Sequence, residues 1–123
     1  MPSHLDVADR FFAAITDGDL EAVSALYADD VVVWHNHDRV EQDKAASLRT
    51  LAWVVANIDG FRYADVRRSA TDNGFVQQHV ARGTNRRGEP VEVPACIVVR
   101  IEAGRITRLD EYLDSRQADQ FSR

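Results

Sequence analysis

The chain has 123 residues and a formal charge of −5, with 45% apolar and 28% charged side chains. This length predicts one domain, residues 1–123, with a single core. The arginines are dispersed among acids without a basic stripe, so nucleic acid is not an expected partner. No apolar run approaches the length of a membrane span, and the N-terminus lacks the pattern of a signal peptide. We therefore expect a cytoplasmic protein without a membrane partner, and its single cysteine, Cys96, excludes an internal disulfide.

Two helices are predicted at the start of the chain. Ser3 to Asp6 has the spacing of a capping box. The residues at helical spacing after it form one apolar face: Leu5, Ala8, Phe11, Phe12 and Ile15. Gly18 ends this helix, and Asp19 is a good N-cap for a second one. The buried side of the second helix is expected to comprise Leu20, Val23, Leu26 and Tyr27.

The next segment is an apolar strand with a polar tip. Val31 to Trp34 is β-branched and aromatic, which favours a strand. This strand ends in four polar side chains: His35, Asn36, His37 and Asp38. Such an arrangement places acid–base groups at the mouth of an apolar pocket.

The remaining sequence predicts one more helix and four strands. The helix covers residues 41–57, and the strands cover residues 61–66, 75–85, 91–101 and 105–113. Asn73-Gly74 is a strong hairpin signal, and the polar tail 114–123 is expected to form a short helix. Segregated helices and antiparallel strands indicate an α+β fold. We expect a curved, mostly antiparallel sheet that wraps around three N-terminal helices as a cone.

Two motifs carry a resemblance to a known family. The first is Ile15-Thr-Asp-Gly-Asp-Leu20 followed by Leu26-Tyr-Ala-Asp-Asp-Val31, and the second runs from Gly104 to Asp114. With the element order, they make the chain similar to the nuclear transport factor 2-like superfamily, and in particular to its SnoaL-like polyketide cyclase branch. The resemblance implies a cone-shaped α+β barrel of the cystatin-like kind, with a pocket lined by alternate strand residues. It also implies a homodimer, which we expect to form through the outer face of the sheet.

Two enzymes of this superfamily can be laid on the chain through the first strand. The catalytic aspartate of ketosteroid isomerase falls on His35, while its two oxyanion donors fall on Phe11 and near Ile97, which cannot donate. In limonene epoxide hydrolase the water-positioning residues fall on Val33 and His35. Its charged set falls on Val80, Gln78 and Glu111, of which only the last is a carboxylate. The resemblance therefore supports neither of these two reactions in its familiar form.

Both overlays predict which strand residues face the pocket. The expected substrate-binding residues are Val33, Gln78, Val80, Arg82, Ala95, Ile97, Leu109, Leu113 and Phe11. A single β-bulge would exchange the faces of one strand and turn His79 inward in place of Gln78. Otherwise His79 is expected at the surface or at an interface.

His35 and Glu111 are the predicted catalytic residues. A neutral imidazole can take and return a proton near neutral pH, and a carboxylate from the facing last strand could fix its tautomer. The alternatives are that His35 merely caps the strand end, and that Glu111 forms a structural ion pair with Arg82. Arg82 could also hold a substrate carbonyl or enolate.

A metal or cofactor is not expected. His35 and His37 have a spacing that suits two metal ligands, but a lone pair of this kind is weak support for a metal site. No nucleotide-binding glycine motif and no nucleophile motif occurs. Cys96 is expected to be a small core residue.

The sequence thus leads to two functional hypotheses. The first is a cofactor-independent isomerase, dehydratase or cyclase that acts on an apolar carbonyl, hydroxy or epoxide compound. The second is a non-catalytic ligand-binding or dimerisation module, whose pocket is closed by Trp34, Phe61 or Tyr63. The two differ in whether His35 and Glu111 converge in an open apolar cavity.

Overall fold

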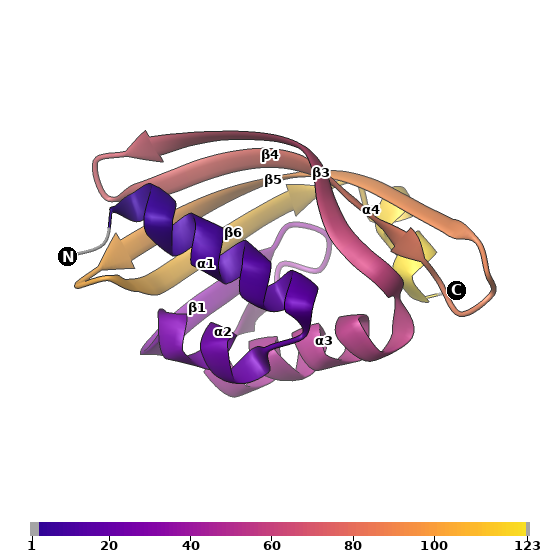
Figure 1. Cartoon of the computed structure of the whole chain (residues 1–123), viewed down its shortest axis with the longest axis horizontal. Coiled ribbons are helices and arrows are strands. Elements are labelled where there is room, and N and C mark those ends of the chain that lie inside the picture. Colours follow the sequence, from indigo (N-terminus) through magenta and orange to yellow (C-terminus); the bar gives the residue numbers. More distant parts are fainter. Residues whose placement is uncertain (1–2, 123) are drawn as a thin grey trace.

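A six-stranded curved sheet with helices on its inner face makes up the computed structural model, which describes residues 3–122 (Figure 1). In chain order the elements are α1 (His4–Asp17), α2 (Leu20–Leu26), β1 (Tyr27–His35), β2 (Glu41–Gln42), α3 (Lys44–Asn57), β3 (Asp59–Thr71), β4 (Gly74–Thr84), β5 (Pro90–Glu102), β6 (Arg105–Leu113), α4 (Ser115–Ala118) and the 3-10 helix η1 (Asp119–Ser122). The predicted α+β class is confirmed.

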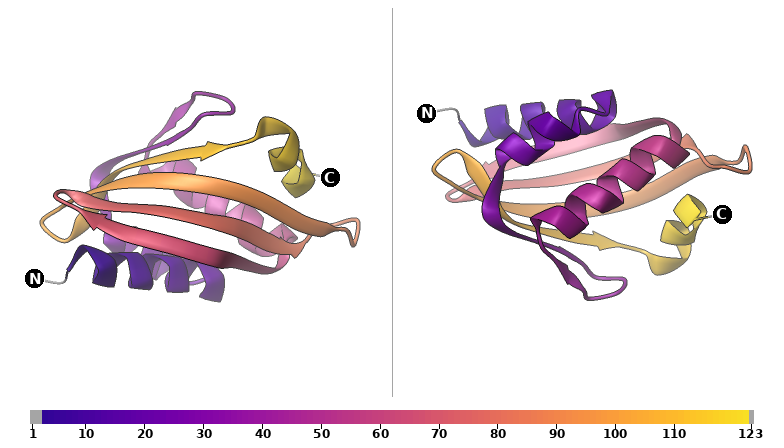
Figure 2. Two further views of the ribbon diagram at one scale, coloured as in Figure 1. Left: turned by 90° about the horizontal axis from the view of Figure 1, so that it is seen from above. Right: turned by 90° about the horizontal axis from the view of Figure 1, so that it is seen from below.

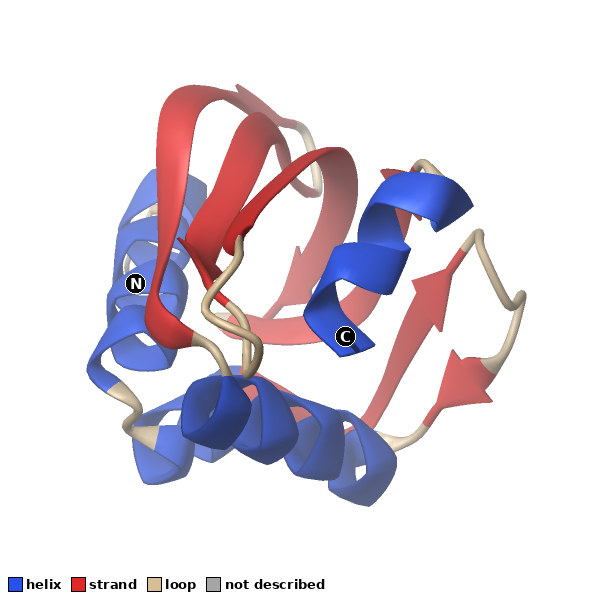
Figure 3. Cartoon of the chain, turned by 90° about the vertical axis from the view of Figure 1, so that its right-hand side faces the viewer, coloured by secondary structure: helices blue, strands red, loops and turns tan. Residues whose placement is uncertain are grey.

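The sheet is mixed and does not close into a barrel. Its strand order is β2-β1-β6-β5-β4-β3, in which only β1 and β6 pair in parallel. Figure 2 shows α1 and α3 lying across the same face of the sheet. Figure 3 shows how strongly the sheet curves, with the C-terminal helix near its open end. This shape is the predicted cone.

The helix ends follow the capping signals of the sequence. Ser3 and Asp6 exchange two hydrogen bonds, of 3.1 and 3.2 Å, so the capping box is present. Gly18 ends α1 with a left-handed backbone (φ 72°), and Asp19 accepts the amide of Ala22 at the start of α2. Local capping residues therefore account for both ends of α1 and for the start of α2.

The third helix starts later than predicted. Asp43 caps α3 by accepting the amide of Ala46, so residues 41–42 are outside the helix. They form the short edge strand β2, which pairs with Val33 and Trp34 of β1. A strand of two residues is too short to show an alternating pattern, so the sequence could not predict it.

The β3–β4 hairpin has a different turn from the one predicted. Its loop is Asp72-Asn73, and Gly74 is the first residue of β4, paired with Thr71. A Cβ atom on Gly74 would lie 1.7 Å from the carbonyl oxygen of Val99. Glycine is therefore required here by the close approach of β5 rather than by a turn conformation.

Most of the apolar core lies between the sheet and the helices. The buried residues of the main cluster include Phe11, Phe12 and Ile15 of α1, which face Phe75, Ile97 and Val99 of the sheet. Leu5, predicted to belong to the same face, is exposed, whereas Val7, which was not predicted to belong to it, is fully buried. Among the described residues, no helix is long and apolar enough to cross a membrane.

Candidate active site

A hollow lies between the inner face of the sheet and the helices. It has an inner lobe of about 70 Å³ and an outer lobe of about 350 Å³. The residues that line both lobes are His35, Thr50, Leu51, Tyr63, His79 and Glu111. The outer lobe alone falls in the volume range of ordinary small-molecule sites, about 300–1,000 Å³.

Most of the residues predicted to face the pocket line this hollow. Phe11, Val33, Ile97 and Leu109 contribute apolar surface to the inner lobe, and Ala95 and Leu113 contribute to the outer lobe. Trp34 does not close it, because its ring lies on the other face and packs edge-on against Tyr112 at 5.4 Å. Phe61 and Tyr63 form part of the wall and leave an open volume.

The predicted orientation of β4 is wrong. Gln78 is exposed and Val80 and Arg82 are half-buried, and none of the three lines either lobe; the inward residues are Gln77, His79 and Ala81. The two bulges of this hairpin lie in β3, one of them at Asp65. The side chains of β4 alternate regularly, but the residues that face inward are the ones predicted to face outward. The pairing of β4 with β5 could have revealed this, because Gln77 and His79 stand directly opposite Ile97 and Ala95.

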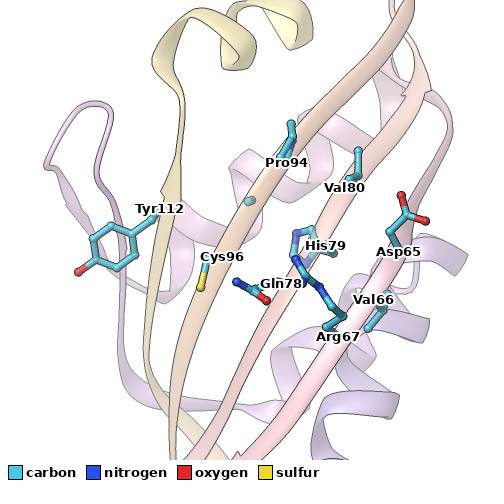
Figure 4. Close-up of a pocket in the computed structure, with 10 residues that line it drawn as sticks. Asp65, Val66, Arg67, Gln78, His79, Val80, Pro94, Cys96 and Tyr112 are labelled. Atoms are coloured by element: carbon cyan, nitrogen blue, oxygen red, sulfur yellow. The ribbon is translucent and has the colours of Figure 1, made fainter.

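The outer face has its own open depression, of about 660 Å³ (Figure 4). Gln78, Val80 and Cys96 border it, so Cys96 is a half-buried outer residue rather than a core residue. Arg82 is also on this side, where it forms ion pairs with Glu92 at 3.4 Å and Asp65 at 3.7 Å. The alternative pairing of Arg82 with Glu111 is therefore wrong.

His35 and Glu111 meet at the edge of the hollow. They are register partners on the parallel strands β1 and β6, and the His35 Nε2 to Glu111 Oε1 distance is 3.0 Å. Asn36 fixes this junction, because its amide donates to the carbonyl of Glu111 and its side-chain oxygen accepts from the amide of Leu113. The side chains of His35 and Glu111 are only 18% and 22% exposed, so solvent screens their interaction weakly.

The contact between them determines the proton chemistry of His35. An ionised Glu111 can only accept, so Nε2 of His35 carries the proton and the neutral ring has its lone pair on Nδ1. Burial, the largest influence, disfavours the imidazolium. The hydrogen bond and negative charge of Glu111, together with Asp38, outweigh burial and raise the pKa of His35 above its ordinary value.

Two phenols in the lining of the inner lobe, Tyr27 and the half-buried Tyr63, contribute polar groups without charge. Tyr27 shares a hydrogen bond of 2.9 Å with Ser47 beneath the inner lobe. Burial raises the pKa of Tyr27 to about 12 and that of Tyr63 well above its ordinary value, and the charge of Glu111 adds to both shifts. Both hydroxyls therefore stay protonated at neutral pH.

A chain of polar side chains that the sequence did not predict lies behind the wall of the hollow that contains His79. Arg68 of β3 contacts Asp9 of α1 and donates from Nε to Gln77 Oε1 at 2.7 Å. Gln77 Nε2 lies 2.9 Å from His79 Nδ1, and both of these residues are buried. His79 is thus neither a surface nor an interface residue, and its ring packs against Tyr63 at 4.7 Å.

His35 and His37 do not lie on the same strand. β1 ends at His35, and His37 lies in the following turn. The centroids of their two rings are 5.7 Å apart. His37 Nε2 is 3.7 Å from Asp38, whose other oxygen accepts the amide of Val40. Within residues 3–122, no group of three potential metal ligands comes together.

Comparison with known proteins places this geometry in a family. The model of the SnoaL-like domain matches residues 8–109. No curated protein sequence matches the chain significantly. Many solved structures are similar, among them a protein proposed to be a polyketide cyclase from Pseudomonas putida KT2440, with 20% identity, a TM-score of 0.85, and coverage of 98% of this chain and 99% of that one.

Two further structures illustrate the range of this likeness. One is a Catenulispora acidiphila protein with a ketosteroid isomerase-like fold in complex with trimethylamine, at 18% identity and a TM-score of 0.80, covering 95% of this chain and 92% of that one. Another is a protein proposed to be an isomerase from Bacillus subtilis, at 16% identity and a TM-score of 0.82, covering 97% and 91%. The TM-scores and coverages show a shared fold. The match of the domain model over most of the chain shows that this protein belongs to the SnoaL-like family.

Proposed function

We propose that this protein is a cofactor-independent enzyme that moves a proton on a largely apolar carbonyl, hydroxy or epoxide compound. The observation that supports the proposal is the convergence of His35 and Glu111, 3.0 Å apart, at the edge of a hollow whose lining is largely apolar. Isomerisation, dehydration and aldol-type cyclisation each need one movable proton and one contact to the developing oxyanion.

His35 acts as the base and then as the acid in this proposal. Its neutral ring takes a proton from the carbon next to a carbonyl, which leaves an enolate and an imidazolium. Glu111 holds the ring and stabilises the imidazolium until the proton returns to another atom of the substrate. The proton balance closes within one turnover, so the cycle needs no oxidant or reductant.

The relatives support a small organic ligand without identifying it. One relative is in complex with trimethylamine, and others are proposed to be a polyketide cyclase or an isomerase. These proteins share the fold at 16–20% identity. They therefore guide the choice of compounds to test, but they do not identify the substrate of this protein.

The proposal includes a homodimer formed through the outer face of the sheet. Three apolar side chains are exposed on that face, Val66 and Val98 each at 43% and Tyr112 at 48%. Pro94, Cys96 and Val80 lie between them across neighbouring strands. A second copy of the chain would cover this apolar surface.

A compound panel tests the proposed activity. Small ketones, hydroxy ketones, epoxides and aromatic polyketides are incubated with the wild type, His35→Gln and Glu111→Gln, and products are followed by NMR. We expect turnover by the wild type to fall about 10²- to 10⁴-fold in His35→Gln, with a smaller loss in Glu111→Gln. His37→Gln is the matched control and should keep its activity. Equal turnover by His35→Gln and the wild type would contradict the proposal.

A further inference from the structure

We propose that the inner lobe recognises a hydroxy-carbonyl compound through two protein atoms. Its carbonyl oxygen accepts a hydrogen bond from Nε2–H of His79, and its hydroxyl group donates to Oε1 of Gln42. This inference rests on the proposed function, because it assigns the substrate class and the orientation for the proton transfer at His35.

The first observation is that two buried polar atoms lack a partner within the protein. Among residues 3–122, Gln42 Oε1 and His79 Nε2 are the two buried side-chain atoms without a hydrogen bond. Both residues line the inner lobe. A buried polar atom without a partner is destabilising, so two of them in one lobe point to a ligand that supplies the missing partners.

The hydrogen-bond chain behind His79 fixes its tautomer. Arg68 can only donate, so the oxygen of the Gln77 side chain must be the atom that accepts from it. The nitrogen of the same amide then donates to Nδ1 of His79. Nδ1 is therefore the unprotonated nitrogen, and the proton of the neutral ring is on Nε2, the atom without a protein partner.

The surroundings also keep His79 neutral. His79 is only 4% exposed, and burial is the main cause that lowers the pKa of its ring below the ordinary value. Glu111 opposes this shift and Arg68 adds to it. A neutral Nε2–H binds a carbonyl oxygen without transferring its proton, as a contact to a developing oxyanion requires.

The side chain of Gln42 is oriented by its hydrogen bond to Thr50. The hydroxyl of Thr50 donates to the carbonyl of Ala46 at 3.2 Å, so it accepts from Gln42 Nε2 at 3.0 Å. This arrangement turns Oε1 of Gln42 away from Thr50 and leaves it as an acceptor in the wall of the inner lobe. The lobe thus offers one donor and one acceptor to the polar end of a ligand.

The charges around the hollow restrict the substrate further. A carboxylate in the inner lobe would be repelled by Glu111 and by Oε1 of Gln42, so a neutral molecule is favoured. The outer lobe has apolar walls formed by Phe61, Val93 and Leu113. The polar end of the substrate therefore enters first, and its apolar body fills the outer lobe.

Three probes separate the two contacts: ethylbenzene, acetophenone and 2-hydroxyacetophenone. Their dissociation constants are measured on the wild type, His79→Phe and Gln42→Leu. For the wild type we expect each added polar group to tighten binding about fivefold to tenfold. His79→Phe should lose the preference for acetophenone over ethylbenzene, and Gln42→Leu only the further gain from the hydroxyl.

Two outcomes of this binding series overturn the inference. One is a wild type that shows no preference for the ketone, including one that binds none of the probes. The other is a His79→Phe variant that keeps the full preference. Neither depends on turnover, so a failed activity assay for His35 and a failed recognition model for His79 remain distinguishable.

Nitrogen-15 NMR of the histidine rings tests the tautomer without any ligand. In the wild type, His79 should show a protonated Nε2 and an unprotonated Nδ1 at pH 7.5. Gln77→Glu keeps the volume but accepts from both neighbours, so Nδ1 should become protonated and the ketone preference at alkaline pH should vanish. A wild-type His79 with its proton on Nδ1 would overturn the inference.

Discussion

Two histidines with opposite proton chemistry face the same hollow. His35 lies beside Glu111, which favours its charged form, whereas His79 is held neutral by burial and by the side chains behind it. Pairs of groups whose environments separate their pKa values are typical of sites that divide acid–base work between residues. Within the proposed mechanism, His35 moves the proton and His79 holds the oxygen.

The raised pKa of His35 predicts how folding stability depends on pH. Because the folded state binds the proton more tightly, the His35–Glu111 pair contributes its full stability below about pH 6.5, the ordinary pKa. The contribution is lost as the pH rises through the raised pKa. Urea unfolding of the wild type and His35→Gln should therefore differ more at pH 5.5 than at pH 8.5, by about 1 kcal/mol or less. A difference that does not change with pH would contradict this account.

For individual residues, the sequence predicted most of the apolar lining and the His35–Glu111 pair, but not the polar side chains opposite that pair. His35 and Glu111 could be predicted because the overlays of two related enzymes place both residues on the inner face of the first and last strands. His79 was expected on the outer face and its inward position only as the alternative that a β-bulge would produce, because both alternations of β4 contain apolar residues. The unpartnered nitrogen of His79 depends on Arg68 and Gln77, a contact across two strands that no local pattern reveals.

The parallel pairing of β1 with β6 brings His35 and Glu111 together. Strands from opposite ends of the chain place His35 and Glu111 in register, and Asn36 ties the two strand ends together just beyond them. The capping signals of the helices could be read from single residues. The two-residue strand β2 and the bulges of β3 could not, because they depend on pairing with neighbouring strands.

Replacement of Asn36 tests whether this junction positions the pair. Asn36→Ala leaves the amide of Leu113 without its partner, so we expect a loss of about 1–2 kcal/mol of stability. The pKa of His35 should also fall toward its ordinary value as Glu111 moves away. Asn57→Ala is the control, because the Asn57 side chain donates only to the carbonyl of Trp53 within α3, so its loss should cost less and leave the His35 titration unchanged. An unchanged His35 titration in Asn36→Ala would show that the junction does not position the pair.

The whole molecule is an open cone whose interior is only partly filled. Large side chains from α1 and the sheet fill one part of it, and the hollow remains between His35, Tyr63 and Leu51. The resemblance predicted this general shape correctly. The volume could not be predicted, because it depends on sheet curvature and on the bulges near Gly60 and Asp65.

The exposed apolar side chains of the outer face predict a dimer in solution. Light scattering of the wild type should give about twice the mass of one chain. Tyr112→Arg introduces a charge among the exposed apolar side chains of this face and should shift the protein toward the monomer. Val40→Arg makes the same kind of change at an exposed position in the turn before β2, and should leave the mass unchanged. A monomeric wild type would contradict the proposed interface.

The central claim is that His35 removes a proton next to a carbonyl, and hydrogen exchange measures that step directly. The exchange of the α-protons of 2-tetralone with D2O is followed by NMR for the wild type, His35→Gln and His37→Gln. We predict at least about a hundredfold acceleration by the wild type and by His37→Gln. The rate should increase as the pH rises through the raised pKa of His35, because only the neutral ring is a base. No acceleration by the wild type, or an equal rate with His35→Gln, would contradict the account.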